Sequence, residues 1–225
     1  MQSEIRHNPD FGIIKVTFDV PGEQLTTESG AMVARDTAME MKTNMQGGVG
    51  GALKRKLLGG ESIFQNTFTA TAPGQTLYVA PASEGTVESV VIEPGTELFL
   101  QSGAYLASTP GVVLDTKWQG SKGFFSGGLF LLRAYGQGRI WFSAYGGIHT
   151  IDLGSDVPGY VCDNSHMVAF TQGLQYKVRK LGGLKSLFLS GEGLVCEFSG
   201  HGRLWIQTRN PGALATFLHP FRLVE

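Results

Sequence analysis

The sequence predicts an all-β protein, a single domain of three repeated β units in a pseudo-threefold sandwich or barrel. The first observation is that short runs of alternating polarity are separated by turn residues, with 32 glycines and 9 prolines in 225 residues. Many short strands between glycine and proline turns are typical of sandwiches and barrels. The second is an internal repeat of about 70 residues. A period of this size indicates one supersecondary unit used several times, each too small to close a core alone.

The first predicted strand covers residues 14–20, where apolar residues at every second position place one face toward a core. Residues 21–31 and 94–104 then share Pro-Gly, Leu and Ser-Gly-Ala at a spacing of 73 residues. A fainter third copy is aligned by a spacing of 70 residues, which sets Val161 against Val91 and Gly173 against Gly103. We therefore expect three copies of one strand arrangement.

Each unit is expected to end in an aromatic strand that follows a glycine turn, at residues 74–79, 138–142 and 202–206. The last two strands share Gly, Arg and Trp at a spacing of 64 residues. The units are predicted to span about 11–82, 83–155 and 156–213, with a tail over 214–225. At most one helical turn is expected, near Gly212–Leu218.

Charged residues make up 16% of the chain, against about 25% in typical domains. So little charge suggests that another subunit covers part of the surface, and we expect a homo-oligomer. The net charge of −1 argues against a general affinity for nucleic acid. The polar N-terminus is unlike a signal peptide and no apolar run reaches about 18 residues. We expect a cytoplasmic protein, with peripheral membrane association left open.

A glycine–lysine–apolar segment recurs in each unit, at residues 53–63, 121–129 and 184–194. Under pseudo-threefold symmetry these segments emerge at one end of the molecule as an interaction rim. The rim residues are Lys54, Leu57, Leu58, Lys122, Phe124, Phe125, Lys185, Leu187 and Phe188. They either fold inward over the core, pack against a second copy, or contact a membrane or another protein. Exposed apolar groups of this size favour association.

No arrangement of residues points to catalysis, a cofactor or a metal. Residues 47–54 are glycine-rich but lack the Gly-Lys-Ser/Thr order of a phosphate loop. The five histidines are dispersed, whereas a metal needs several converging ligands. Cys162 and Cys196 lie in apolar runs without a CxxC spacing, so we expect two reduced core thiols. The sequence predicts a non-enzymatic protein.

The Pro-Gly…Ser-Gly-Ala units, residues 64–69, Gly-Arg-Ile-Trp at 138–141 and residues 202–211 together resemble the "altered inheritance of mitochondria" family. Bacterial members of that family are mostly of unknown function, and a eukaryotic relative is a mitochondrial inner-membrane biogenesis factor. The resemblance implies a fold like that of the tryptophan RNA-binding attenuation protein, of the double-stranded β-helix type with three structural repeats. It brings no catalytic residues.

Three functions follow as expectations. The first is a scaffold or interaction protein that associates with itself through the interaction rim. The second is a membrane-surface or lipid-binding module in membrane biogenesis. The third, RNA binding, rests on fold analogy alone, with one supporting cluster of Trp118, Lys117 and Lys122.

Overall fold

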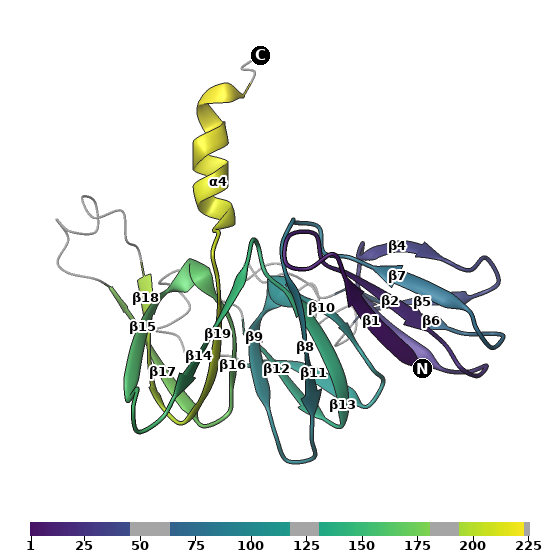
Figure 1. The fold of residues 1–225 in the computed structure, drawn as a ribbon, viewed down its shortest axis with the longest axis horizontal. Helices are drawn as coiled ribbons and strands as arrows, with labels where there is room; N and C mark the ends of the chain where they lie inside the picture. Colours follow the sequence, from purple (N-terminus) through teal and green to yellow (C-terminus); the bar gives the residue numbers. More distant parts are fainter. Residues whose placement is uncertain (46–63, 118–130, 181–193, 223–225) are drawn as a thin grey trace.

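The computed structural model describes residues 1–45, 64–117, 131–180 and 194–222, and these contain nineteen β-strands in four sheets. The sheets lie in a row, with the N-terminal strands at one end and the C-terminal strands at the other (Figure 1). The all-β prediction is confirmed. The described residues form no closed barrel, and a pseudo-threefold axis stays a prediction.

The first sheet has four strands in the order β1-β2-β7-β4. Their bounds are β1 (Gln2–Arg6), β2 (Ile13–Thr17), β4 (Met32–Arg35) and β7 (Thr76–Val79). The predicted alternation over residues 14–20 is confirmed for β2, because Ile14 and Val16 are fully buried. Strand β4 is an edge strand of this sheet, and among the described residues it pairs with β7 alone.

Two six-stranded sheets follow, ordered β5-β6-β3-β10-β13-β8 and β11-β12-β9-β16-β19-β14. The strands of the first are β3 (Gln24–Glu28), β5 (Glu40–Met45), β6 (Phe64–Thr69), β8 (Val87–Ile92), β10 (Tyr105–Ser108) and β13 (Gly138–Ser143). Those of the second are β9 (Leu98–Gln101), β11 (Val112–Lys117), β12 (Leu131–Gly136), β14 (Ile148–Leu153), β16 (Met167–Thr171) and β19 (Gly202–Gln207). Each sheet therefore joins segments that are distant in the sequence.

The fourth sheet has three strands in the order β15-β18-β17. They are β15 (Gly159–Asp163), β17 (Leu174–Lys180) and β18 (Leu194–Gly200). Short 3-10 turns connect β9 to β10 and β15 to β16, at η1 (Ser102–Ala104) and η2 (Asn164–His166). Strand β15 is an edge strand of this sheet, and within the described ranges it pairs only with β18.

The predicted alignment of a third copy is wrong. Val91 lies in β8 but Val161 lies in β15, so the two residues occupy different places in the strand order. By order, β15 corresponds to β9, because each precedes a 3-10 turn. Gly173 precedes β17 as Gly111 precedes β11, and each contacts the glycine that ends the partner strand, Gly200 or Gly136. Ser-Gly-Ala at η1 is replaced by Asn-Ser-His at η2, which removed the sequence signal.

Three clusters of buried side chains follow one another along the row. The aromatic strands link them. Trp141 of β13 packs in the cluster that contains Ile14 and Phe68, whereas Trp205 of β19 packs in the cluster that contains Leu100 and Phe142. Each tryptophan thus contributes to the core that precedes its own strand in sequence, and this ties neighbouring parts of the row together.

The predicted helical turn is present as helix α4 (Pro211–Leu218), followed by the 3-10 turn η3 (His219–Phe221). Asn210 caps the helix by accepting a hydrogen bond from the Ala213 amide at 3.0 Å, and Pro211 occupies the first turn, where no amide donor is needed. The helix stands away from the sheets (Figure 1). The predicted tail boundary at residue 214 therefore falls inside α4.

Candidate interaction surfaces

The nine residues of the predicted interaction rim all lie outside the described residues. They are Lys54, Leu57, Leu58, Lys122, Phe124, Phe125, Lys185, Leu187 and Phe188. The same holds for Trp118 and Lys122 of the cluster considered for RNA. The candidate surfaces among the described residues are therefore built from other residues, which the sequence patterns did not single out.

The first surface consists of one edge strand from each of the two outermost sheets, β4 and β15, which we call the end edges. Met32 and Val33 are exposed on β4, and Tyr160 and Val161 are exposed on β15. Val33 is 57% exposed and Val161 is 55% exposed. An unpaired strand edge offers a row of backbone donors and acceptors to another strand. Apolar side chains beside such an edge add a second reason for association.

The second surface is the segment α4–η3. Leu214, Leu218, Phe217 and Phe221 are all exposed, the two phenylalanines at 67% and 73%. The ring centres of Phe217 and Phe221 lie 5.9 Å apart, so these two side chains form one apolar patch. Arg209 and Arg222 flank the segment and are exposed, and the sequence contains no Asp or Glu from Phe198 to Arg222. The segment therefore combines exposed apolar groups with positive charge.

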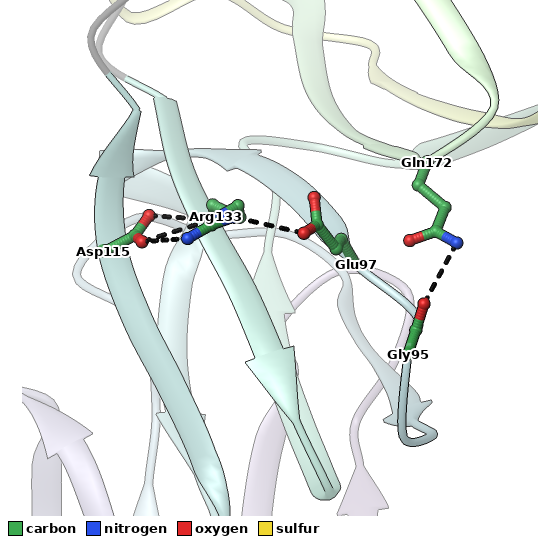
Figure 2. A network of polar contacts seen from close by, with 5 residues as sticks. All are labelled: Gly95, Glu97, Asp115, Arg133 and Gln172. Carbon is green, nitrogen blue, oxygen red and sulfur yellow. Dashed lines mark hydrogen bonds and ion pairs between the residues drawn. The ribbon is translucent and has the colours of Figure 1, made fainter.

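A polar network around Arg133 joins β11 and β12 to the residue that precedes β9 (Figure 2). The Arg133 guanidinium donates from Nε to Asp115 Oδ1 at 3.1 Å and from Nη1 to Glu97 Oε1 at 3.1 Å. The hydrogen bonds to Asp115 and the negative charges nearby raise the pKa of Arg133. Its charged group also lies 4.6 Å from the Tyr135 ring centre, in cation–π contact.

A hollow of about 460 Å³ lies beside this network. Its lining is Pro94, Gly95, Thr96, Glu97, Tyr135, Gly136 and Gln137. Gln172 reaches the same turn by donating from Nε2 to the Gly95 carbonyl at 3.2 Å (Figure 2). Glu97, the one carboxylate of the lining, is already held by Arg133. These contacts hold β9, β11, β12 and the β16–β17 turn together, and we assign the network a structural role.

The two cysteines lie directly opposite each other, Cys162 on β15 and Cys196 on β18. Both are free and buried, as predicted, but no sequence pattern indicates that they face each other. Burial raises the pKa of Cys162 to about 12 and that of Cys196 to about 11. Because the thiolate is the reactive form, both groups are unreactive near neutral pH.

Within the four described ranges, no three His, Cys, Asp or Glu side chains gather as a metal site would require. The described part of the chain also contains no helix that is long and apolar enough to span a membrane.

Comparisons with known proteins place the chain in a family. The family model "Mitochondrial biogenesis AIM24" matches residues 3–209. An uncharacterized protein of Streptococcus pyogenes serotype M6 is 29% identical over 220 residues, which cover 93% of this chain and 86% of that protein. A crystal structure of a Streptococcus pyogenes protein superposes with a TM-score of 0.80 at 26% identity, covering 98% of this chain and 99% of the other. The chain belongs to the AIM24 mitochondrial biogenesis family.

Proposed function

We propose that this protein is a non-enzymatic scaffold that works by associating with itself. The observation that carries the proposal is the exposure of apolar side chains on both end edges, Met32 and Val33 at one end of the row and Tyr160 and Val161 at the other. Unprotected strand edges are sites of strand addition, and soluble proteins usually blunt them with charge, proline or a covering loop. The end edges replace the interaction rim as the surfaces on which the proposal rests.

Light scattering behind a sizing column tests self-association over a wide range of protein concentration. We expect the wild-type mass to be a multiple of the 24.2 kDa chain. The double variant Val33→Asp, Val161→Asp should have the mass of one chain, because a buried unpaired carboxylate is costly. Val20→Asp is the matched control, since Val20 is 54% exposed but lies outside the strands. A wild-type protein that has one chain's mass at every concentration contradicts the proposal.

A second candidate function is binding to a membrane surface, and the α4–η3 segment supports it. Exposed Leu and Phe side chains flanked by arginines are the composition of interfacial membrane segments, whose apolar groups enter the lipid while the cations meet anionic headgroups. The association of the family with mitochondrial biogenesis is consistent with this function.

Vesicle flotation tests the second function. We expect the protein to float with vesicles containing phosphatidylserine, to float less with pure phosphatidylcholine, and to stay at the bottom when Phe217 and Phe221 are both changed to Asp. Val20→Asp again serves as the control, because it adds a charge far from α4 in the sequence. If neither vesicle type carries the wild-type protein, this function is excluded.

A further inference from the structure

Two internal junctions join successive parts of the row, and both are made in the same way. Strand β10 pairs antiparallel with β3, and Ala107 faces Thr27. Strand β16 pairs antiparallel with β9, and Ala169 faces Leu100. At the second junction Phe99 and Phe170 stack with their ring centres 5.1 Å apart. Each junction is therefore a direct strand-to-strand contact with a defined register.

Strand β4 has the same local geometry as β10 and β16. All three pair antiparallel with an aromatic strand, and all three contain a bulge after the first pair. The bulge places one alanine of each strand at an equivalent position, opposite an aromatic residue. The pairs are Ala34 with Tyr78, Ala107 with Trp141, and Ala169 with Trp205. A shared bulge fixes the correspondence residue by residue, since it marks one position in each strand.

Strand β15 has the same place in the chain as β9. Each is followed at once by a 3-10 turn and then by the strand that makes a junction, β16 or β10. Cys162 stands two residues before η2, as Leu100 stands two residues before η1. Cys162 therefore corresponds to Leu100, and Val161 corresponds to Phe99.

The residues at these equivalent positions differ sharply in exposure. Leu106 and Val168, which correspond to Val33, are 0% and 1% exposed. Phe99, which corresponds to Val161, is 6% exposed. The internal junctions thus bury the positions that the end edges leave in solvent. Strand β4 thus corresponds to one half of an internal junction and β15 to the other half, yet the two strands lie at opposite ends of the row (Figure 1).

We propose that copies of this chain join head to tail, with β15 of one copy pairing antiparallel with β4 of the next. The internal junctions set the register: Ala34 of one copy faces Cys162 of the other, and Arg35 faces Val161. The contact joins two different surfaces, so an open assembly keeps one free β4 end and one free β15 end until it closes into a ring. This inference rests on the proposed self-association and specifies its surfaces, direction and register.

The first test blocks one end at a time. Val33→Asp and Val161→Asp are purified separately, and circular dichroism confirms that each is folded. In a head-to-tail contact, Val33→Asp has only its β15 end available and Val161→Asp has only its β4 end available. Each variant alone should therefore have the mass of one chain. Mixed in equal amounts they should give twice 24.2 kDa, because one intact junction remains. A contact between two identical edges predicts instead that at least one single variant still dimerises.

The second test checks the register by cross-linking. Arg35→Cys and Val161→Cys are made on separate chains, mixed and oxidised with diamide, which takes up two electrons and two protons as the two thiols form one disulfide. Facing residues of an antiparallel pair are close enough for this bond. Arg35→Cys mixed with Tyr160→Cys is the matched control, because neighbouring residues of a strand point to opposite faces. Wild-type protein with diamide controls for the buried native thiols.

The outcomes separate the two proposals. Monomeric single variants, a dimeric mixture and a cross-link specific to the 35–161 pair are expected. If the wild type is oligomeric but the single variants also stay oligomeric, the head-to-tail contact is wrong and self-association still holds. The same conclusion follows if the 35–160 control forms the cross-link to the same extent as the 35–161 pair. A wild-type protein with the mass of one chain overturns both.

Discussion

Phe99 and Phe170 stack across the β9–β16 junction, with their ring planes inclined by 19°. Both rings are almost completely buried, and Phe170 also contacts Phe198 edge-on with a centroid separation of 5.3 Å. A pair of aromatic residues thus joins one of the six-stranded sheets at its centre and extends into the C-terminal core.

Phe170→Ala should lower the free energy of unfolding by about 3–5 kcal/mol, because it removes a buried ring and leaves a cavity at the junction. Urea denaturation followed by circular dichroism measures this change. Phe11→Ala is a suitable control, since Phe11 is 71% exposed and its removal leaves no cavity. Equal effects of the two substitutions would show that the stacked pair contributes little.

Gly200→Ala should destabilise the protein more than Gly95→Ala. Both glycines have positive φ, +104° and +83°, which costs alanine about 1–2 kcal/mol. A Cβ at Gly200 would also stand 2.3 Å from the Gly173 carbonyl oxygen, whereas a Cβ at Gly95 meets nothing within 4 Å. Urea midpoints of the two variants isolate the cost of this close approach. Equal urea midpoints for the two variants would mean that the backbone at Gly173 moves aside freely.

The free energy of unfolding should fall at alkaline pH, partly through the cysteines. Burial raises the pKa of Cys162 and Cys196 in the folded protein from an ordinary value of 9.0 to about 12 and about 11. As the pH rises, the unfolded chain therefore releases these protons first. The contribution that the two thiols make to stability below pH 9 is lost as the pH rises through their pKa values in the folded protein.

The double variant Cys162→Ala, Cys196→Ala is the comparison. Its unfolding free energy, measured in urea between pH 8 and pH 11, should decline less steeply than that of the wild type. Indistinguishable slopes would mean that the two thiols titrate alike in the folded and unfolded chains.

Removing residues 211–225 should leave the stability of the sheets unchanged. Every residue of α4 is exposed, and the helix has its main contacts with η3. The urea midpoint of the truncated chain should therefore match that of the full chain, while binding of the apolar dye ANS falls because Phe217 and Phe221 are gone. A lower midpoint would show that α4 supports the fold.

The sequence predicted those parts of the fold that depend on local patterns. The alternation in β2, the aromatic strands that contain Trp141 and Trp205, and the short helix after Asn210 all follow from spacing and capping residues. The predicted position of a third copy is wrong because η2 has a different sequence from η1. The spacing of 70 residues therefore sets Gly173 against Gly103, whereas the strand order sets it against Gly111.

The candidate surfaces were beyond the reach of pattern alone. Val33 and Val161 look like ordinary strand residues, since their equivalents Leu106 and Phe99 are also apolar and are buried. Only the strand order shows that β4 and β15 are edge strands of the first and fourth sheets. The apolar character of the α4 segment was visible in the sequence, but whether it packed against the sheets depended on tertiary structure.

The order of the strands also bears on how the molecule folds. Strands β8, β10 and β13 complete one six-stranded sheet, while β9, β11 and β12 complete the other. The central stretch of the chain therefore has no sheet of its own, and neither large sheet exists without it. Its loss would leave three-stranded remnants on both sides with their apolar faces in water. Unfolding that begins in the middle of the row should spread to both ends, so that the three cores melt as one cooperative unit.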